Sequence, residues 1–148
     1  MRKQNKKFFT EEESIYFLKQ IMVGFQELHK HKIMHRDFKL ANLFVNDDTL
    51  IIGDFGFAKS GFDMAQTKLG TPLTMAPELL MDANSYTSKA DLWSIGVVFY
   101  QLMFGDPPFF ALSINELIGI IKKGSGQNLK IPRNTQNISP DAEDILKS

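Results

Sequence analysis

Three residues whose side-chain oxygens could bind a metal ion lie close together in the first part of the sequence. Asp37 and Asn42 lie five positions apart in a polar stretch between apolar flanks, and Asp54 follows a short distance beyond. This spacing lets one loop bring oxygen ligands near the same metal ion, and carboxylate and amide oxygens suit Mg²⁺. Taken singly, Asp37 is better explained as a turn aspartate and Asn42 as a cap.

The elements around these residues predict a mainly helical domain of the α+β class. Thr10 and Glu13 form a capping box that opens an amphipathic helix. Two short apolar runs joined by Asn46–Thr49 predict a tight β-hairpin between Asn42 and Asp54. We expect helices over 11–31 and 88–104, helices opened by Ser113 and by Ser139, and strands over 43–45 and 50–52.

Two later stretches have contrasting patterns. The predicted helix over 88–104 carries apolar residues on all faces and stops at Gly105, which is typical of a helix in the middle of a domain. Its most apolar part is too short to cross a bilayer. Residues 54–78 form a long irregular segment rich in Gly, Thr and Pro. A segment of this kind inside a compact domain is usually either functional or a sign that its secondary structure has been assigned wrongly.

Composition narrows the class of protein. The 148 residues include 17 basic and 17 acidic side chains, and this balance argues against a nucleic-acid surface. Cysteine is absent, which excludes disulfides and thiolate metal sites and fits a reducing compartment. The N-terminal sequence lacks the apolar core of a secretory signal. We therefore expect a cytoplasmic protein without a nucleic-acid partner or a membrane span.

Short motifs follow one another in a fixed order: His35-Arg36-Asp37-Phe38-Lys39-Leu40-Ala41-Asn42, then Asp54-Phe55-Gly56, then Ala76-Pro77-Glu78, and then Asp91–Gly96. From about Phe9 onward the sequence resembles the large C-terminal lobe of eukaryotic Ser/Thr protein kinases, which carry these motifs in this order. The resemblance implies one partial kinase domain over residues 1–148. Its parts would be a catalytic loop at 35–42, an activation segment at 54–78 and a central helix at 88–104.

The resemblance implies a role for each chemical residue. Asp37 would orient the substrate hydroxyl and accept its proton, and Lys39, typical of Ser/Thr kinases, would contact the transferred phosphate. Asn42 and Asp54 would hold Mg²⁺ on the phosphates of ATP. Phe44 falls where the family has the apolar floor of the adenine pocket, and simple core packing is its alternative explanation.

Two further residues are expected to support the catalytic loop without taking part in the chemistry. The resemblance implies that His35 packs against Phe55. It also implies that the Asp91 carboxylate holds the catalytic-loop backbone in place. An aspartate at the start of a helix also interacts favourably with the helix dipole, which is the plainer explanation of Asp91.

Regulation is expected in the irregular segment. Thr67 lies where many kinases are phosphorylated, and a phosphate there would carry the charge to pair with Arg36. An unmodified loop threonine is the alternative. Thr71 matches the threonine that packs against the catalytic Asp37 and Lys39 in Ser/Thr kinases.

The sequence contains no Gly-x-Gly-x-x-Gly loop, which the family's small N-terminal lobe supplies. We therefore expect this lobe to be absent from the chain, and the isolated chain to be inactive or nearly so. The full protein is expected to phosphorylate Ser and Thr of protein substrates, with a non-catalytic, kinase-derived binding module as the alternative. Residues 54–60, 70–80 and 88–109 resemble the ULK-like autophagy-initiating kinases, and the calmodulin-dependent kinase group is the close second.

Overall fold

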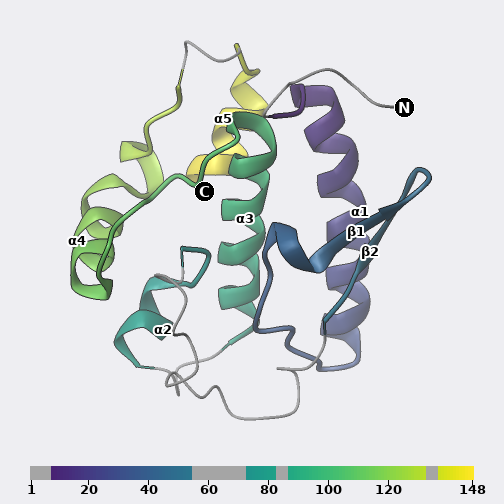
Figure 1. Cartoon of the computed structure of the whole chain (residues 1–148), viewed down its shortest axis with the longest axis horizontal. Helices are drawn as coiled ribbons and strands as arrows, with labels where there is room; N and C mark the ends of the chain where they lie inside the picture. Colours follow the sequence, from purple (N-terminus) through teal and green to yellow (C-terminus); the bar gives the residue numbers. More distant parts are fainter. Residues whose placement is uncertain (1–7, 55–72, 83–86, 133–136) are drawn as a thin grey trace.

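The fold is described here from a computed structural model, which covers residues 8–54, 73–82, 87–132 and 137–148. Helix α3 runs through the middle of the molecule, with α1 on one side and α4 on the other (Figure 1). The elements in chain order are α1 (Glu11–Lys30), η1 (Leu40–Asn42), β1 (Leu43–Asn46), β2 (Thr49–Ile52), α2 (Pro77–Met81), α3 (Ser88–Phe104), α4 (Ile114–Gly124), η4 (Gly126–Asn128) and α5 (Pro140–Lys147).

Helix α1 begins where the capping box predicts it. The backbone N–H of Glu13 donates to Thr10 Oγ1 at 3.2 Å, and the backbone N–H of Thr10 donates to the Glu13 carboxylate at 2.9 Å. Both bonds satisfy donors that a helix start leaves without an intrahelical partner. The helix ends at Lys30, one residue before the predicted end.

Helix α3 supplies more buried apolar residues than any other described element, and it stops at Gly105 as predicted, with that glycine at φ 86°. Its apolar residues point in several directions, so separate clusters form around it. One cluster packs α3 on α1 and includes Ile21 and Val98, both fully buried. Another lies toward α5 and includes Phe99 and Met103. A helix that is buried in this way fixes the positions of its neighbours.

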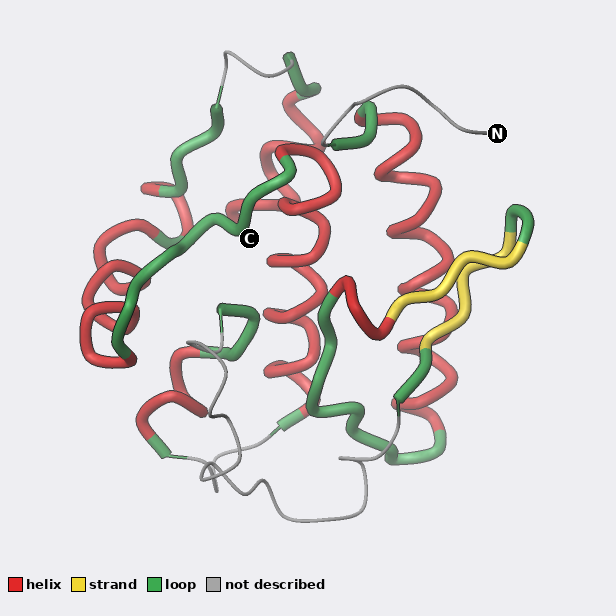
Figure 2. The backbone as a smooth tube through the Cα atoms, in the orientation of Figure 1, coloured by secondary structure: helices red, strands yellow, loops and turns green. Residues whose placement is uncertain are grey.

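The two strands of the described residues form one antiparallel hairpin beside α1 (Figure 2). Each strand is one residue longer than predicted, and Asn46 pairs with Thr49. Gln20 of α1 holds the hairpin through both ends of its amide: it accepts from the Leu50 N–H at 2.8 Å and donates to the Asp48 carbonyl at 3.0 Å. The hairpin is therefore fixed to a helix rather than to a larger sheet.

Close contact between α1 and the hairpin requires a small residue in the helix. A Cβ on Gly24 would lie 2.5 Å from Ile52 Cδ1, nearer than real Cβ contacts occur. The Ile52 side chain of β2 therefore packs directly against the backbone of α1 at Gly24. This contact fixes how close the hairpin, and the residues on either side of it, lie to α1.

Helices α4 and α5 also begin at capping residues, whereas Ala76 before α2 makes no side-chain cap. Ser113 Oγ accepts from the Glu116 N–H at 3.3 Å, as the sequence predicts for α4. The Glu116 carboxylate, however, accepts from the Leu112 N–H, one residue before the cap. Helix α2 is not predicted by the sequence pattern, because five residues are too few to show a period. No helix of the described parts is long and apolar enough to span a membrane.

Candidate active site

The backbone of the loop at 35–37 is held by two side chains. The Asp91 carboxylate, 1% exposed, accepts from the His35 N–H at 2.9 Å and from the Arg36 N–H at 3.0 Å. The next N–H, that of Asp37, donates to His35 Nδ1 at 3.3 Å. Arg36 has φ 69°, in the left-handed region. Three successive N–H groups thus find acceptors in a conformation that is costly for a residue other than glycine.

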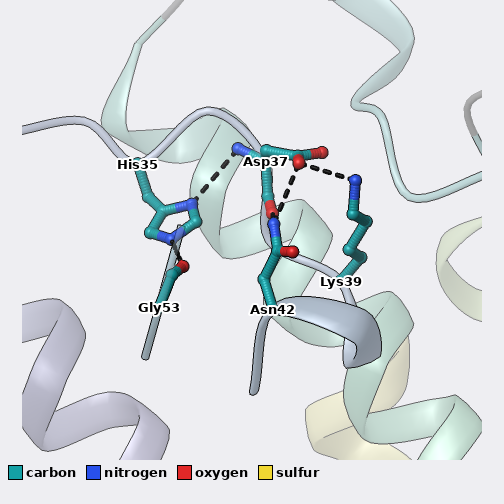
Figure 3. A network of polar contacts seen from close by, with 5 residues as sticks. All are labelled: His35, Asp37, Lys39, Asn42 and Gly53. Atoms are coloured by element: carbon teal, nitrogen blue, oxygen red, sulfur yellow. Dashed lines mark hydrogen bonds and ion pairs between the residues drawn. The ribbon is translucent and has the colours of Figure 1, made fainter. Parts of the chain in front are cut away.

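The same loop brings Asp37, Lys39 and Asn42 together (Figure 3). Lys39 Nζ lies 2.7 Å from Asp37 Oδ2, and Asn42 Nδ2 donates to that same oxygen at 2.9 Å. Asn42 Nδ2 also donates to the Asp37 carbonyl at 2.8 Å. These bonds orient the Asp37 carboxylate through one oxygen and leave the other oxygen outside these contacts.

Gly53, at the end of the hairpin, connects to the catalytic loop at two points. His35 Nε2 lies 3.0 Å from the Gly53 carbonyl, and the Gly53 N–H donates to the Asn42 carbonyl at 2.9 Å. Because His35 Nδ1 accepts from the Asp37 N–H, we assign the ring proton to Nε2. Asp37, His35, Gly53 and Asn42 therefore form a closed ring of hydrogen bonds.

The resemblance predicts that His35 packs against Phe55, which lies outside the described residues, so that contact stays a prediction. His35 is fully buried, and its ring centroid lies 4.5 Å from that of Phe38. Its two ring nitrogens additionally join the two halves of the site, a role that the sequence gives no signal for. The left-handed conformation of Arg36 turns the Asp37 N–H toward the ring, and that conformation is not visible in the residue types.

Asp54 directly follows this ring of hydrogen bonds. It is exposed and has φ 59°, again in the left-handed region. Asn42 is 5% exposed, and its side-chain nitrogen Nδ2 donates to Asp37. Its side-chain oxygen Oδ1 is therefore the atom that suits a metal ion. Two protein oxygens fit Mg²⁺, which usually takes the rest of its ligands from phosphates and water. The described residues contain no cluster of three or more acidic, His or Cys ligands.

Phe44 lies on β1, opposite Ile51 of β2, and is 54% exposed. Packing within the described residues therefore leaves more than half of this side chain exposed. The ring lies over Gly53, the residue before Asp54. An apolar surface thus adjoins the polar cluster.

Of the predicted regulatory residues, Arg36 lies among the described residues. Arg36 is partly buried in the catalytic loop, where its backbone is bound by Asp91. Thr67 and Thr71 lie outside the described residues, as does Phe55. Their roles stay predictions.

Comparison with known proteins agrees with the geometry. The family model described as protein kinase domain matches residues 1–148. The chain is 40% identical over 148 residues to Serine/threonine-protein kinase atg1 of Dictyostelium discoideum, covering 96% of this chain and 21% of that protein. It is 40% identical over 140 residues to Serine/threonine-protein kinase ATG1a of Arabidopsis thaliana, covering 90% of this chain and 22% of that protein.

A second group of kinases has a comparable sequence identity to this chain. Serine/threonine-protein kinase plk-1 of Caenorhabditis elegans is 43% identical over 122 residues, covering 80% of this chain and 19% of that protein. The chain spans about a fifth of the length of these curated relatives. The ULK-like resemblance is confirmed by the Atg1 relatives, with PLK kinases also close. The chain belongs to the protein kinase domain family.

Proposed function

We propose that this chain is part of a Ser/Thr protein kinase that transfers the γ-phosphate of ATP to Ser or Thr hydroxyls of proteins. The observation that carries the proposal is the cluster of Asp37, Lys39 and Asn42 around one carboxylate oxygen. The hydrogen bonds of Gly53 tie Asp54 to the same cluster. The Atg1 relatives support an ULK-like, autophagy-initiating kinase. We further propose that the protein works in the cytoplasm.

Asp37 is the residue that handles the proton. Held through Oδ2 by Lys39 and Asn42, it presents its other oxygen to the substrate hydroxyl. The hydroxyl oxygen forms a bond to the γ-phosphorus while the bond from that phosphorus to the bridging oxygen of ADP breaks. The hydroxyl proton passes to the Asp37 carboxylate. Lys39, 43% exposed, then neutralises charge on the transferred phosphate.

Asn42 and Asp54 are the residues that would hold Mg²⁺. The ion, when bound, would offset the negative charge of the ATP phosphates. Asn42 is kept in place by its bonds to Asp37, so the base and the metal ligand move together. Phe44 offers its exposed ring to the adenine base.

Regulation would act through the catalytic loop. A phosphate on Thr67 would add roughly −1.5 to −2 charge and pair with Arg36, whose backbone Asp91 already fixes. Thr71 would pack against Asp37 and Lys39. Both proposals follow from the family's motifs.

The test is transfer of labelled phosphate from ATP to a protein substrate by the full-length protein that contains this chain. Asp37→Asn keeps the shape of the side chain and one acceptor for Asn42, but removes the base. We expect the rate to fall by about 10²–10⁴-fold, the usual contribution of a general base. Asp48→Asn, an exposed change in the hairpin turn, is the matched control. Equal rates for Asp37→Asn and the control would refute the proposal.

We also propose that the isolated 148-residue chain transfers phosphate poorly. Positioning of the reactants supplies roughly 7–11 kcal/mol of a barrier, and this chain contains no glycine-rich loop to cover the phosphates. Efficient phosphorylation of a peptide by the purified chain would contradict this.

A non-catalytic binding module is the second candidate. Phe110 and Leu112, before α4, are 64% and 86% exposed and lie two positions apart, so a partner could cover both apolar side chains. The Asp37→Asn experiment separates the two candidates, because a binding module has no rate to lose.

A further inference from the structure

Helix α3 carries two buried polar side chains near its start, in a helix whose other buried residues are mostly apolar. Asp91 is 1% exposed and Ser94 is 8% exposed. Residues three positions apart lie on the same face of a helix, with their Cβ atoms about 5–6 Å from each other. Because Asp91 holds the catalytic loop, Ser94 lies beside the point where that loop is attached.

The hydroxyl of Ser94 reaches a backbone carbonyl in another part of the chain. Ser94 Oγ lies 2.7 Å from the Thr74 carbonyl oxygen and 3.1 Å from the carbonyl oxygen of Ala90, four residues earlier in α3. A serine in a helix can simply donate to the residue four positions earlier, which is the plainer explanation of its hydroxyl. A hydroxyl has one proton, however, and the shorter distance assigns that proton to Thr74.

Thr74 belongs to the turn before α2, residues 73–76, which lies beside α3. Leu73 and Met75 of this turn pack against an apolar cluster shared by α2 and α4. Apolar packing has no preferred direction, whereas the hydrogen bond from Ser94 fixes one backbone group at one place. The bond therefore sets where the turn before α2 lies along α3.

We propose that Ser94 is a positioning residue, which aligns the protein substrate with Asp37 by holding the turn before α2. One face of α3 binds the catalytic loop through Asp91 and this turn through Ser94, so the two backbones keep a fixed separation. A substrate chain whose hydroxyl reaches Asp37 would pass along the turn. The inference rests on the proposed function and adds to it how the chain orients a protein substrate.

The experiment measures KM for a protein substrate, KM for ATP and kcat of the full-length protein carrying Ser94→Ala. We expect KM for the protein substrate to rise about five- to tenfold, the size of effect that the loss of one hydrogen bond produces. KM for ATP and kcat should stay within about twofold of wild type, because the bonds from Asp91 to the catalytic loop remain. A merely structural role of Ser94 would not separate the two KM values.

Ser14→Ala is the matched control, because Ser14 is also a buried serine in a helix. Ser14 is 0% exposed, and its Oγ has no hydrogen-bond partner among the described residues. Its substitution removes the same hydroxyl without breaking a hydrogen bond, so both KM values should stay unchanged. Thermal unfolding of each variant shows whether the protein is still folded.

Hydrogen–deuterium exchange reports on the turn before α2 without relying on enzyme activity. The backbone amides of residues 73–80 should exchange at least about threefold faster in Ser94→Ala than in wild type, because the turn has lost its attachment to α3. The amides of the catalytic loop, residues 35–42, should keep their rates, because Asp91 still holds that loop.

An unchanged KM for the protein substrate in Ser94→Ala would overturn the inference and leave the proposed function intact. Equally faster exchange over 35–42 and 73–80 would also overturn it, because the serine would then only stabilise α3. If Ser94→Ala unfolds the protein, Ser94→Cys must show the same rise in the substrate KM, since a thiol fills a similar volume but is a weak donor. Without that rise the inference is wrong. A wild-type protein that transfers no phosphate would refute the proposed function and, with it, the inference.

Discussion

At the residue scale, the catalytic loop depends on a carboxylate that touches none of the expected reactants. The left-handed conformation of Arg36 costs of order 1–3 kcal/mol for a residue with a side chain. The two backbone bonds to Asp91 offset that cost, because hydrogen bonds to a buried charged group are stronger than neutral ones. Asp91 therefore acts by positioning Asp37, and its exposed fraction of 1% keeps water from competing.

Asp91→Asn tests this positioning role. The substitution keeps the volume of the side chain. It replaces one carboxylate oxygen by an NH₂ group, which cannot accept, so one of the two backbone N–H groups loses its hydrogen bond. A buried donor without a partner costs about 1–3 kcal/mol, so the free energy of unfolding in a denaturant titration should fall by that amount. Asp47→Asn is the control, because Asp47 is exposed and its φ of 53° suits Asn. A stability for Asp91→Asn equal to that of the control would contradict the role.

At the scale of elements, a pair of side chains joins the first turn of α1 to the N-cap of α5. The Glu11 carboxylate accepts from the Ser139 N–H at 2.7 Å and from Ser139 Oγ at 2.6 Å. Ser139 Oγ also accepts from the Ala142 N–H at 3.2 Å and so caps α5. The first turn of α1 thus holds the first turn of α5 across 128 positions of sequence.

Glu11→Gln and Ser139→Ala measure the strength of this link. Glu11→Gln should lower the free energy of unfolding by about 1–2 kcal/mol, because its amide nitrogen cannot accept from Ser139. Ser139→Ala should cost a similar amount and lose the helix cap as well. The double variant should cost less than the sum of the two single changes. Glu12→Gln, in the same turn but exposed, is the control, and an additive double variant would show that the two residues do not interact.

Sequence patterns predict those elements whose signals are local. The capping residues Thr10, Ser113 and Ser139 lie within a few positions of the backbone groups they bind, and Gly105 ends α3 by its own conformation. Helix α2 has too few residues to show a period. The bond from Ser139 to Glu11 joins distant parts of the chain and leaves no trace in the spacing of residue types.

The candidate site divides in the same way. The motif spacing predicts the cluster of Asp37, Lys39 and Asn42, because these residues share one loop. The fit of Phe44 over Gly53 depends on the register of the hairpin, and the glycine by itself looks like an ordinary residue at the end of a strand. Sequence therefore gives the chemical groups, and the packing around them comes from three-dimensional structure.

At the scale of the whole molecule, α3 connects the parts that lie around it. Tyr100 of α3 is 6% exposed, and its hydroxyl donates to the Lys130 carbonyl at 3.0 Å, in the segment that leads from η4 toward α5. Its ring also packs on that of Phe104, with centroids 4.6 Å apart. Ionisation of this phenol would therefore disturb both the aromatic packing of the core and the hydrogen bond to the segment after η4.

The stability of the molecule should accordingly fall at alkaline pH. Burial, and then the negative charge of Asp106, raise the pKa of the Tyr100 phenol above its ordinary value of 10.0. Below pH 10 the phenol is neutral in both the folded and the unfolded chain, so it adds no pH dependence. Above pH 10 the unfolded chain loses the proton first, and stability is lost as the pH rises through the folded pKa, by at most about 1.4 kcal/mol for each unit of pH.

Two variants isolate this effect in unfolding free energies measured from pH 8 to pH 12. Tyr100→Phe should cost about 1 kcal/mol at pH 8, from the lost hydrogen bond to Lys130, and should then lose less stability than wild type above pH 10. Asp106→Asn should reduce the alkaline loss without removing it, because burial of the phenol remains. If Tyr100→Phe and wild type lose stability in parallel above pH 10, the phenol is not the group responsible, and the alkaline limit of the fold must arise elsewhere.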